Sequence, residues 1–445
     1  MNDSKQDCGI RPSYNAISRP FPPGSRVTAS FTDENHQAFI RNIGIKTLPG
    51  FMLEEKSGWE HVQSISASNH PEQTVSRDTV KICHLTSVHE RYDIRIFLKQ
   101  CRSLAKAGHD VTLVVADGRG AEIREGVRIV DAGKRATSRP LRMTLTARKV
   151  LAAARSTGST IFHLHDPELI PVGLQLKRDG ARVIFDSHED YITDILTKPY
   201  LKFGTARLVS VLYDRFERSA LAAFDGVVSA YDAIANSYHE RGINSQVINN
   251  YPIEEEISLV PRPSVRPGLV CYTGAITTIR GVPNLIDAMA HCRTPVKLLL
   301  VGPFTEKRAE ESCKSSKGWE RVEAFGLLNR QAMREQMDRC LAGLVTFLPV
   351  ANHVAAQPNK LFEYMAAGLA VIGADFPLWK EIIEGEGCGI CVDPTDPEAT
   401  AAAIDRLNAE PELARMMGEA GRQAVLKRYN WNAEAEKLQA FYATL

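Results

Sequence analysis

The stretch QPNKLFEYMAAGLAVIGAD, residues 357–375, decides the fold that the rest of the chain is expected to adopt. Asn359 is suited to cap a short helix, and Gly368 is suited to end it. The apolar run LAVIGA that follows is typical of a parallel strand that is buried on both faces. The stretch therefore predicts a loop, a short helix and a buried strand.

The predicted helix has two different faces. On a helical wheel Leu361, Phe362 and Met365 fall on one side, whereas Lys360 and Glu363 fall on another. We therefore expect the ammonium and the carboxylate to leave the core together and to face outward. The alternative role for Glu363 is to complement the helix dipole from the first turn.

The motif P-x-K-L-F-E-Y-M-A-A-G before an apolar strand resembles the donor-nucleotide loop of glycosyltransferase family 4. Members of that family are retaining sugar transferases with two Rossmann-like domains, the GT-B arrangement. The resemblance implies that Glu363 accepts hydrogen bonds from the ribose of a nucleotide-sugar, and that Asn359 and Lys360 lie at the donor site. The family usually has a second glutamate eight positions before Glu363, where this chain has Ala355.

A second donor motif is expected in GLVCYTGAITTIRGVPNLIDAMA, residues 268–290, which predicts a strand, a loop and a helix. The family pattern has a glycine, an arginine directly after it, and a basic residue before a second glycine. Gly274, Arg280 and Gly281 match this pattern, whereas Ala275 occupies the arginine position. A guanidinium beside a helix N-terminus suits a diphosphate, so we expect Arg280 to bind one. The alternative for Arg280 is a surface side chain without a ligand.

Polar side chains follow three strands that are predicted in the first half of the chain. These strands lie in TVKICHLTS, STIFHLHD and ARVIFDSHED, and the first begins a strand–helix–strand unit of a parallel sheet. Ligands bind at the carboxyl ends of such strands, so one rim is expected to gather the polar residues on the acceptor side. They are His89, Asp93, Arg95, His165, Asp166, His188 and Glu189.

Two of these residues are predicted to be catalytic, namely His188 and Asp166. The resemblance implies that His188, in the F-x-S-H type segment, lies beside the reacting sugar. We do not assign it as the base, because the donor phosphate is often thought to take the acceptor proton in retaining members. The loop VHERYDIRIF replaces the usual glycine-rich loop and resembles bacterial polysaccharide-biosynthesis members of the family. The alternative for this loop is a solvated surface.

The expected fold is α/β, with two Rossmann-like domains that face each other across a cleft. We predict a poorly ordered extension at 1–78, an acceptor domain at 79–252, a proline-rich linker at 253–267, a donor domain at 268–429, and a terminal helix at 430–445. The resemblance implies that this last helix crosses back to the first domain.

The composition fits an ordinary globular enzyme. The chain has 445 residues, of which 44% are hydrophobic and 24% charged, and its net charge of +1 gives no overall attraction to nucleic acid. Nine cysteines at irregular spacing indicate a reducing cytoplasm rather than a disulfide framework. No apolar run approaches the length of a bilayer span. No compact acidic pattern indicates a metal site, and no cofactor is expected.

These observations predict an enzyme that moves a sugar from a nucleoside diphosphate sugar to a glycan or lipid-linked acceptor with retention. Cell-surface polysaccharide biosynthesis is the expected setting. A nucleotide-sugar epimerase or a glycan phosphorylase shares the same two-domain build and remains an alternative. A catalytically dead scaffold subunit is another alternative, because Ala275 and Ala355 remove two expected donor contacts.

The segment 134–155 contains seven basic residues and no acidic one. As a helix from Leu141 it should turn Met143, Ala147, Val150, Leu151 and Ala154 inward, and Arg142, Arg148, Lys149 and Arg155 outward, with Leu141 and Leu145 between them. This pattern suits anionic lipid and predicts peripheral association with the inner membrane. The alternative is a solvated basic face.

Overall fold

The computed structural model describes residues 79–188, 203–257 and 267–445, and in the second range it describes side chains from residue 207 onward. The predicted extension at 1–78, Glu189 and most of the predicted linker lie outside the described residues. Both sheets of the described part belong to the same compact unit.

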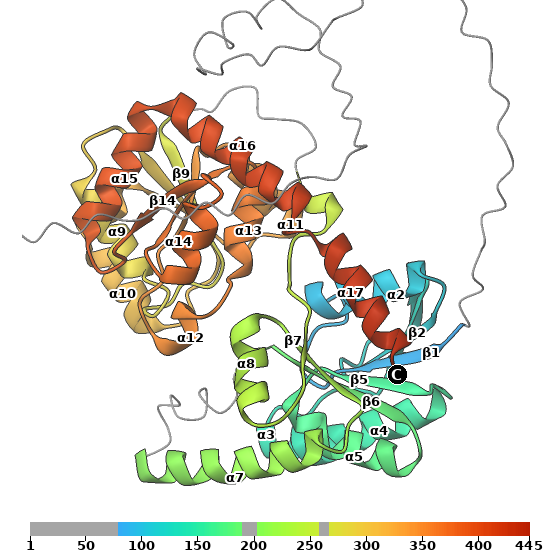
Figure 1. Cartoon of the computed structure of the whole chain (residues 1–445). Helices are drawn as coiled ribbons and strands as arrows, with labels where there is room; N and C mark the ends of the chain where they lie inside the picture. The colour runs from blue at the N-terminus through green and yellow to red at the C-terminus, as the bar shows by residue number, and fades with distance from the viewer. Residues whose placement is uncertain (1–78, 189–202, 258–266) are drawn as a thin grey trace, which may run out of the picture. The chain divides into compact units, whose positions relative to one another are not determined.

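The first sheet contains eight strands in the order β3-β4-β2-β1-β5-β6-β7-β8 within the described ranges (Figure 1). All neighbours pair in parallel except β3 and β4, which are antiparallel. The strands are β1 (Lys81–Leu85), β2 (Asp110–Val115), β3 (Glu122–Arg124), β4 (Val127–Asp131), β5 (Ile161–Leu164), β6 (Arg182–Ser187), β7 (Gly226–Ser229) and β8 (Gln246–Val247). The strand–helix–strand unit that the sequence predicts from Thr79 is confirmed by the parallel pairing of β1 and β2.

Helices cover both faces of this sheet. Along β1 the side chains alternate, so that Cys83 and Leu85 pack into one apolar core and Ile82 packs into another. The helical segments after β1 are η2 (Ile94–Cys101) and α2 (Arg102–Lys106); the others are α3 (Arg139–Leu141), η3 (Arg142–Thr146), α4 (Ala147–Ser156), η4 (Pro167–Leu169), α5 (Ile170–Arg178), α7 (Phe203–Leu221), α8 (Asp232–Glu240) and η5 (Glu254–Glu256).

The second sheet has six parallel strands in the order β11-β10-β9-β12-β13-β14. They are β9 (Leu269–Thr273), β10 (Lys297–Val301), β11 (Val322–Gly326), β12 (Ala342–Val345), β13 (Ala370–Ala374) and β14 (Gly389–Val392). All five residues of β13 are buried, which explains why this strand is a continuous apolar run rather than an alternating one. The two parallel sheets confirm the expectation of two α/β domains.

Helices pack on both sides of the second sheet as well. They are α9 (Val282–His291), α10 (Lys307–Ser315), η6 (Lys317–Arg321), α11 (Arg330–Met337), α12 (Ala351–Val354), α13 (Asn359–Ala366), α14 (Pro377–Ile383), α15 (Pro397–Ala409) and α16 (Pro411–Lys427). The final helix, α17 (Trp431–Ala443), instead packs on α2 and η2 of the first sheet (Figure 1). Trp431 donates from Nε1 to Ser103 Oγ over 2.8 Å, so the predicted crossing of the terminal helix is confirmed.

The start of α13 differs from the prediction. Pro358 precedes the helix as its cap residue, and Asn359 is the first helical residue without a capping hydrogen bond. The proline takes this place because it has no backbone N–H to satisfy and its backbone angle suits a helix start. Gly368 ends the helix as predicted: its φ of 69° is left-handed, and its N–H donates to the Met365 carbonyl over 2.9 Å.

Candidate active site

The carboxyl ends of both sheets line a cavity of about 970 Å³. This cavity gathers predicted residues from the two halves of the chain, as expected for open α/β sheets. From the first half it is lined by His89, Asp93, Arg95 and His188, which belong to what we call the first wall. From the second half it is lined by Gly274, Arg280, Asn359, Lys360 and Glu363, which belong to the second wall.

Lys360 lies at the floor of the cavity and not on an outward face. The residue is 8% exposed, and its Nζ lies 3.8 Å from the centre of the Tyr272 ring and 5.0 Å from that of Phe347. The expectation that Lys360 leaves the core is therefore wrong, because its ammonium lies over two aromatic rings inside the protein. Nζ has no hydrogen-bond partner in the described part of the chain. Burial lowers the pKa of Lys360 well below its ordinary value, and the charge of Arg280 lowers it further.

Gly274 makes room for this ammonium. Its φ is 113°, and a Cβ at this position would lie 3.1 Å from the Lys360 Nζ. A side chain is therefore excluded both by the backbone conformation and by the lysine. Gly274 directly follows β9 and leaves the space that the buried ammonium occupies.

Arg280 is the second cation on this wall. It precedes Gly281, which caps the N-terminus of α9, and it donates from Nη1 to the Ala275 carbonyl over 3.3 Å. Its guanidinium lies 5.8 Å from the centre of the Phe347 ring. A guanidinium and a helix N-terminus at one place favour a bound anion.

Glu363 is the carboxylate of the second wall, and its charge affects the pKa of three basic side chains. Burial lowers the pKa of Lys99, Arg330 and Lys360, and the Glu363 carboxylate opposes that shift in all three. Burial is strong enough to lower the pKa of Lys99 to about 7. The carboxylate therefore lies in a cationic surrounding while its side chain remains accessible from the cavity.

The loop before α13 lacks the second glutamate of the family motif. Ala355 is exposed and does not line the cavity, whereas Ala356 and Gln357 do. The Ala356 N–H donates to the His353 carbonyl over 3.2 Å, and the Gln357 Oε1 accepts from the Tyr251 hydroxyl over 3.1 Å. The amide of Ala356 is thus already engaged within the loop.

His89 is the most accessible histidine of the first wall, and Asp166 holds it from behind. Their closest atoms, Nδ1 and Oδ1, lie 3.0 Å apart. Burial lowers the pKa of His89, but the hydrogen bond and charge of Asp166 outweigh it and raise that pKa. Asp166 is itself buried and accepts from the Ser87 N–H over 2.6 Å and from the Thr86 hydroxyl over 2.9 Å. Burial opposes its ionisation, yet the bond to His89 and these donors lower its pKa to about 2.

Two acceptor-side expectations are corrected by this arrangement. Asp166 and His165 were expected on the rim, but both are buried and neither lines the cavity. Asp166 lies behind His89 because it ties together the loop after β1. His165 lies under His188, with the two rings stacked at a centroid distance of 5.7 Å.

Arg95 lines the cavity, but its guanidinium is engaged elsewhere. Its Nε and Nη2 donate to the two carboxylate oxygens of Asp186 over 3.0 and 2.8 Å, and Nη1 donates to the Ile248 carbonyl over 2.9 Å. Asp93 is likewise occupied, because it caps η2 through the N–H groups of Arg95 and Ile96. Both residues lie at the predicted rim and build the wall of the cavity, with their charged groups engaged within the protein.

Asp186 is a buried carboxylate that organises the histidines of this wall. Besides Arg95 it accepts from Gln100 Nε2 over 2.6 Å, and it lies 3.7 Å from His188 Nδ1 and 3.4 Å from His165 Nδ1. Burial lowers the pKa of His188, and the Asp186 charge opposes that effect. Burial therefore favours the neutral imidazole of His188 at the cavity, with the Asp186 carboxylate nearby.

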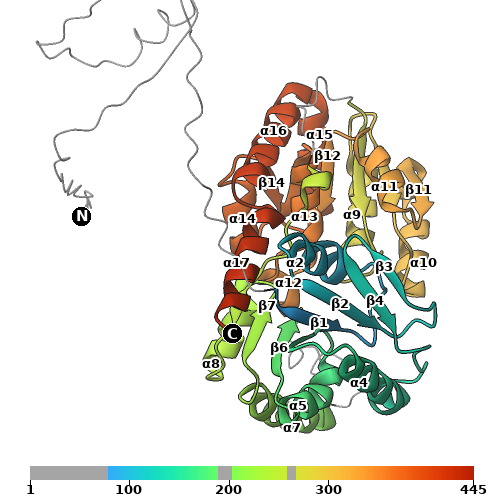
Figure 2. The ribbon, with the colours of Figure 1, turned by 90° about the vertical axis from the view of Figure 1, so that its right-hand side faces the viewer.

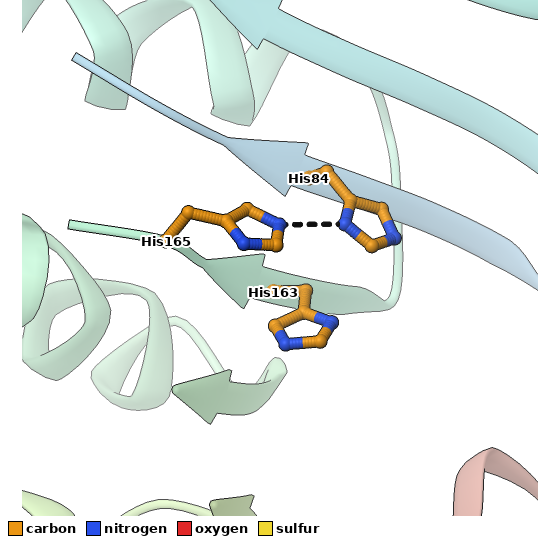
Figure 3. Close-up of side chains that lie close together, drawn as sticks. All are labelled: His84, His163 and His165. Atoms are coloured by element: carbon orange, nitrogen blue, oxygen red, sulfur yellow. Dashed lines mark hydrogen bonds between the residues drawn. The ribbon is translucent and has the colours of Figure 1, made fainter. Parts of the chain in front are cut away.

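His165 and two further imidazoles, those of His84 and His163, lie close together behind this wall, as Figure 3 shows. His84 and His163 are partners across β1 and β5, and His165 follows β5. One nitrogen of each lies within 4.8 Å of the others, which is a set that zinc could accept. However, His84 Nδ1 and His165 Nε2 are hydrogen-bonded directly over 2.8 Å.

Charge also argues against a cation among these rings. Asp186 is already neutralised by Arg95, so a dication at the three imidazoles would leave buried positive charge without compensation. Tyr442 of α17 contributes a further bond, because its hydroxyl lies 2.7 Å from His163 Nδ1. The arrangement favours a hydrogen-bonded stack of neutral histidines that attaches α17 to the first sheet.

Sequence reasoning missed Asp186, Lys99 and Arg330. Arg330 lines the cavity and pairs with Glu256. It comes soon after the end of β11, as Arg280 comes soon after the end of β9, so the same sequence pattern could have predicted it. Asp186 could have been found from its place inside an otherwise apolar strand, since a buried carboxylate needs a partner and therefore predicts a buried cation nearby.

Solved structures resemble this chain over most of its length. Sucrose-phosphate synthase from Thermosynechococcus elongatus has a TM-score of 0.66 at 19% identity, covering 82% of this chain and 98% of that chain. The Anabaena protein Alr3699/HepE in complex with UDP has a TM-score of 0.61 at 15% identity, covering 82% and 100%. These likenesses show that the fold is GT-B, which confirms the predicted fold class.

Several mycobacterial enzymes are similar in sequence. The alpha-maltose-1-phosphate synthase of Mycolicibacterium smegmatis is 28% identical over 184 residues, which cover 39% of this chain and 47% of that protein. The MMP alpha-(1->4)-mannosyltransferase of Mycolicibacterium hassiacum is 23% identical over 328 residues, covering 68% and 74%. This chain thus spans about half the length of the first relative and about three quarters of the second.

Two family models match the chain one after the other. The model described as a glycosyl transferase 4-like domain matches residues 95–250, and the model of glycosyl transferases group 1 matches residues 254–424. The boundary between the two matches falls between the two sheets. Together with the shared fold and the similar enzymes, these matches support a GT-B glycosyltransferase of the glycosyltransferase 4 type.

Proposed function

We propose that this chain transfers a sugar from a nucleoside diphosphate sugar to a hydroxyl of a glycan or lipid-linked acceptor, with retention at the anomeric carbon. One observation carries the proposal: Arg280, Lys360 and Glu363 share a cavity with His89 and His188. Cations for a diphosphate and a carboxylate for ribose thus face imidazoles that can order a sugar. The proposal includes the cytoplasm as the site of the reaction and cell-surface polysaccharide biosynthesis as its setting.

The donor would bind to the second wall. Its diphosphate fits Arg280, Lys360 and the N-terminus of α9, and its ribose hydroxyls fit the Glu363 carboxylate. In the reaction the bond between the anomeric carbon and the phosphate oxygen breaks, and negative charge develops on the nucleoside diphosphate. Fixed cations and helix dipoles stabilise that charge in a closed site.

The acceptor would enter along the first wall. Its hydroxyl oxygen forms the new bond on the face that the phosphate leaves, and the departing phosphate takes the hydroxyl proton. In this proposal His188 orders the reacting sugar, and His89 orders the acceptor with Asp166 behind it. The neutral state of His188, which burial favours, suits hydrogen bonds to sugar hydroxyls in both directions.

A donor screen tests this function. Calorimetry with UDP-, GDP- and ADP-sugars should show binding of one base, and NMR of the product should show the anomeric configuration of the donor. UDP-sugars are the first to test, because the similar Anabaena protein is described in complex with UDP and glucose. Absence of binding for every nucleotide would contradict the proposal and favour a scaffold role. An inverted product would contradict retention alone.

A further inference from the structure

Exposed apolar side chains gather on two segments of the first domain. Among the described residues, eight of the fourteen large apolar side chains that are exposed lie on α3, η3 and α7. Those on α7 are Leu208, Val209, Val211, Leu212 and Phe216, and those on α3 and η3 are Leu141, Met143 and Leu145. The other six are scattered over the rest of the described chain. This clustering distinguishes one face from an ordinary protein surface.

The polarity of α7 is reversed along most of its length. Its inner side carries Glu217, which is buried and accepts from Arg241 Nη2 over 2.6 Å, and Asp214, which pairs with Arg241 over 2.8 Å. Its outer side carries Leu208 and Leu212, which are 61% and 58% exposed. A surface helix normally turns its apolar side to the core, so this helix is attached by ion pairs and presents its apolar side outward.

The segment α3–η3 is also more apolar outside than the sequence predicts. Met143 was expected to face the core, but its side chain is 47% exposed. The buried residue of η3 is Thr146. Arg142 was expected to face outward but pairs with Glu168, with Nε and Oε1 2.8 Å apart. The inward positions predicted on α4 are confirmed by the burial of Ala147, Val150, Leu151 and Ala154.

These segments belong to one layer of helices. The helix α5 contacts both α4 and α7. Figures 1 and 2 show α4, α5 and α7 together along one face of the first sheet. We call the exposed side chains of α3, η3 and α7 the apolar face.

The exposed charged side chains on the described residues of α3, η3, α4 and α7 have one sign. They are Arg139, Arg148, Lys149, Arg155, Arg207, Arg215 and Arg218, of which Arg155 pairs with Asp179, directly after α5. No exposed carboxylate occurs on the described residues of α3, η3, α4 or α7. Asp214 and Glu217, the acidic residues of α7, both pair with Arg241. Exposed apolar side chains flanked by exposed basic ones are complementary to a bilayer surface, which has anionic headgroups outside and apolar chains beneath them.

We propose that the apolar face docks on an anionic lipid surface. This inference extends the proposed function, because a lipid-linked acceptor would be held at such a surface, but it concerns a region outside the cavity. A second copy of this chain fits the face less well. Two-fold pairing would set the arginines of one copy against those of the other, without carboxylates to compensate.

Vesicle sedimentation tests the proposal with the full chain. We expect the wild type to sediment with vesicles of phosphatidylcholine containing about 30% phosphatidylglycerol, and much less with phosphatidylcholine alone. Leu208→Ser, Leu212→Ser and Phe216→Ser together should reduce the partition coefficient by about tenfold or more. The matched control is Ile123→Ser, Met416→Ser and Leu426→Ser, which removes three exposed apolar side chains elsewhere. This control should sediment like the wild type.

Several outcomes would overturn the proposal. They are a wild type that stays in the supernatant, equal binding to neutral vesicles, or an α7 variant that binds like the wild type. A wild-type dimer that becomes monomeric in the α7 variant, without vesicle binding, would assign the face to a second copy instead. If the serine variant does not fold, Arg207→Glu with Arg215→Glu tests the same face by charge. Nucleotide calorimetry on each variant separates these outcomes from failure of the donor site, since the altered residues do not line the cavity.

Discussion

The two walls of the cavity treat charge in opposite ways. On the first wall Asp186 binds Arg95 through two hydrogen bonds and Asp166 binds His89, so the charged groups neutralise one another within the protein. On the second wall Lys360 Nζ has no hydrogen-bond partner among the described residues. The first wall therefore pairs its charged groups within the protein, whereas the second holds cationic groups whose charge an anionic ligand would neutralise.

Removing Asp186 should have the largest effect on stability. Asp186→Ala leaves the buried Arg95 guanidinium without its carboxylate, so we expect a loss of about 3–5 kcal/mol in the free energy of unfolding. Urea unfolding followed by circular dichroism measures this loss. At temperatures where the variant is folded, its affinity for nucleotide should change little, because the donor contacts lie on the second wall.

The double variant Arg95→Met with Asp186→Leu is the control for this effect. It removes both charges at once, and apolar replacement of a buried pair is often neutral or stabilising. The double variant should therefore be clearly more stable than Asp186→Ala. Equal stability of the two would show that packing, and not an unpaired charge, causes the loss.

Glu363 should give the largest effect on the second wall. A carboxylate that accepts two hydroxyl bonds contributes on the order of 2–4 kcal/mol, so Glu363→Gln should weaken nucleotide binding by about one to three orders of magnitude. Calorimetry with the best donor measures the change. Ala355→Glu restores the second motif glutamate and should leave the affinity for the free nucleotide unchanged. A Glu363→Gln variant with wild-type affinity would leave only the helix-dipole role for this residue.

Arg280 should have a somewhat smaller effect. Its guanidinium contributes charged hydrogen bonds to the diphosphate, each worth about 1.5–3 kcal/mol, so Arg280→Ala should weaken the binding of a nucleoside diphosphate by about tenfold or more. Binding of the nucleoside without phosphates should be unaffected. The melting temperature should also stay close to that of the wild type, since Arg280 makes no ion pair with a described residue. Equal losses for nucleoside and diphosphate would remove Arg280 from the phosphate site.

The fold was predictable because buried parallel strands leave a strong local signal. LAVIGA became β13 as predicted, since a strand covered on both faces needs an unbroken apolar run. The short strand β3 escaped prediction because none of its three residues is buried, and its neighbour β4 has only two buried residues, Val127 and Ile129. Positions after strand ends also located Arg280 and His188, because the carboxyl ends of parallel strands meet at one edge.

The burial of site residues was less predictable. Lys360 was expected to face outward with Glu363, and its position depends on Tyr272 and Phe347 of other strands and loops. Arg95 looked like a ligand contact in its loop, yet Asp186, far away in the sequence, engages it. A helical wheel shows which residues share a face, but only tertiary packing decides whether a charge on that face is paired. The comparison of the two walls is therefore a property of the structure and not of the motifs.

The smallest predicted effect is the pH dependence of nucleotide affinity, which should come from Lys360 of the second wall. Burial lowers the pKa of Lys360 in the free protein, and a bound diphosphate would stabilise the ammonium and raise that pKa. Binding then takes up a proton at pH values between the two pKa values. Within that window the affinity for a nucleoside diphosphate should fall as pH rises, by up to about tenfold per pH unit.

Lys360→Met gives the decisive comparison for this pH effect. The variant lacks the amine, so its weaker affinity should not fall across that window, and calorimetry in buffers of different ionisation enthalpy should show no proton uptake by this group.

The same variant tests stability in the absence of nucleotide. At pH values below the ordinary lysine pKa, free Lys360→Met should be more stable than the free wild type, because the unfolded wild type binds a proton that burial disfavours in its folded state. Methionine keeps the packing on Tyr272 without a buried amine. Replacement of a charged group should thus stabilise the second wall, whereas Asp186→Ala destabilises the first. Loss of stability in Lys360→Met would show that the ammonium is already compensated in the free protein.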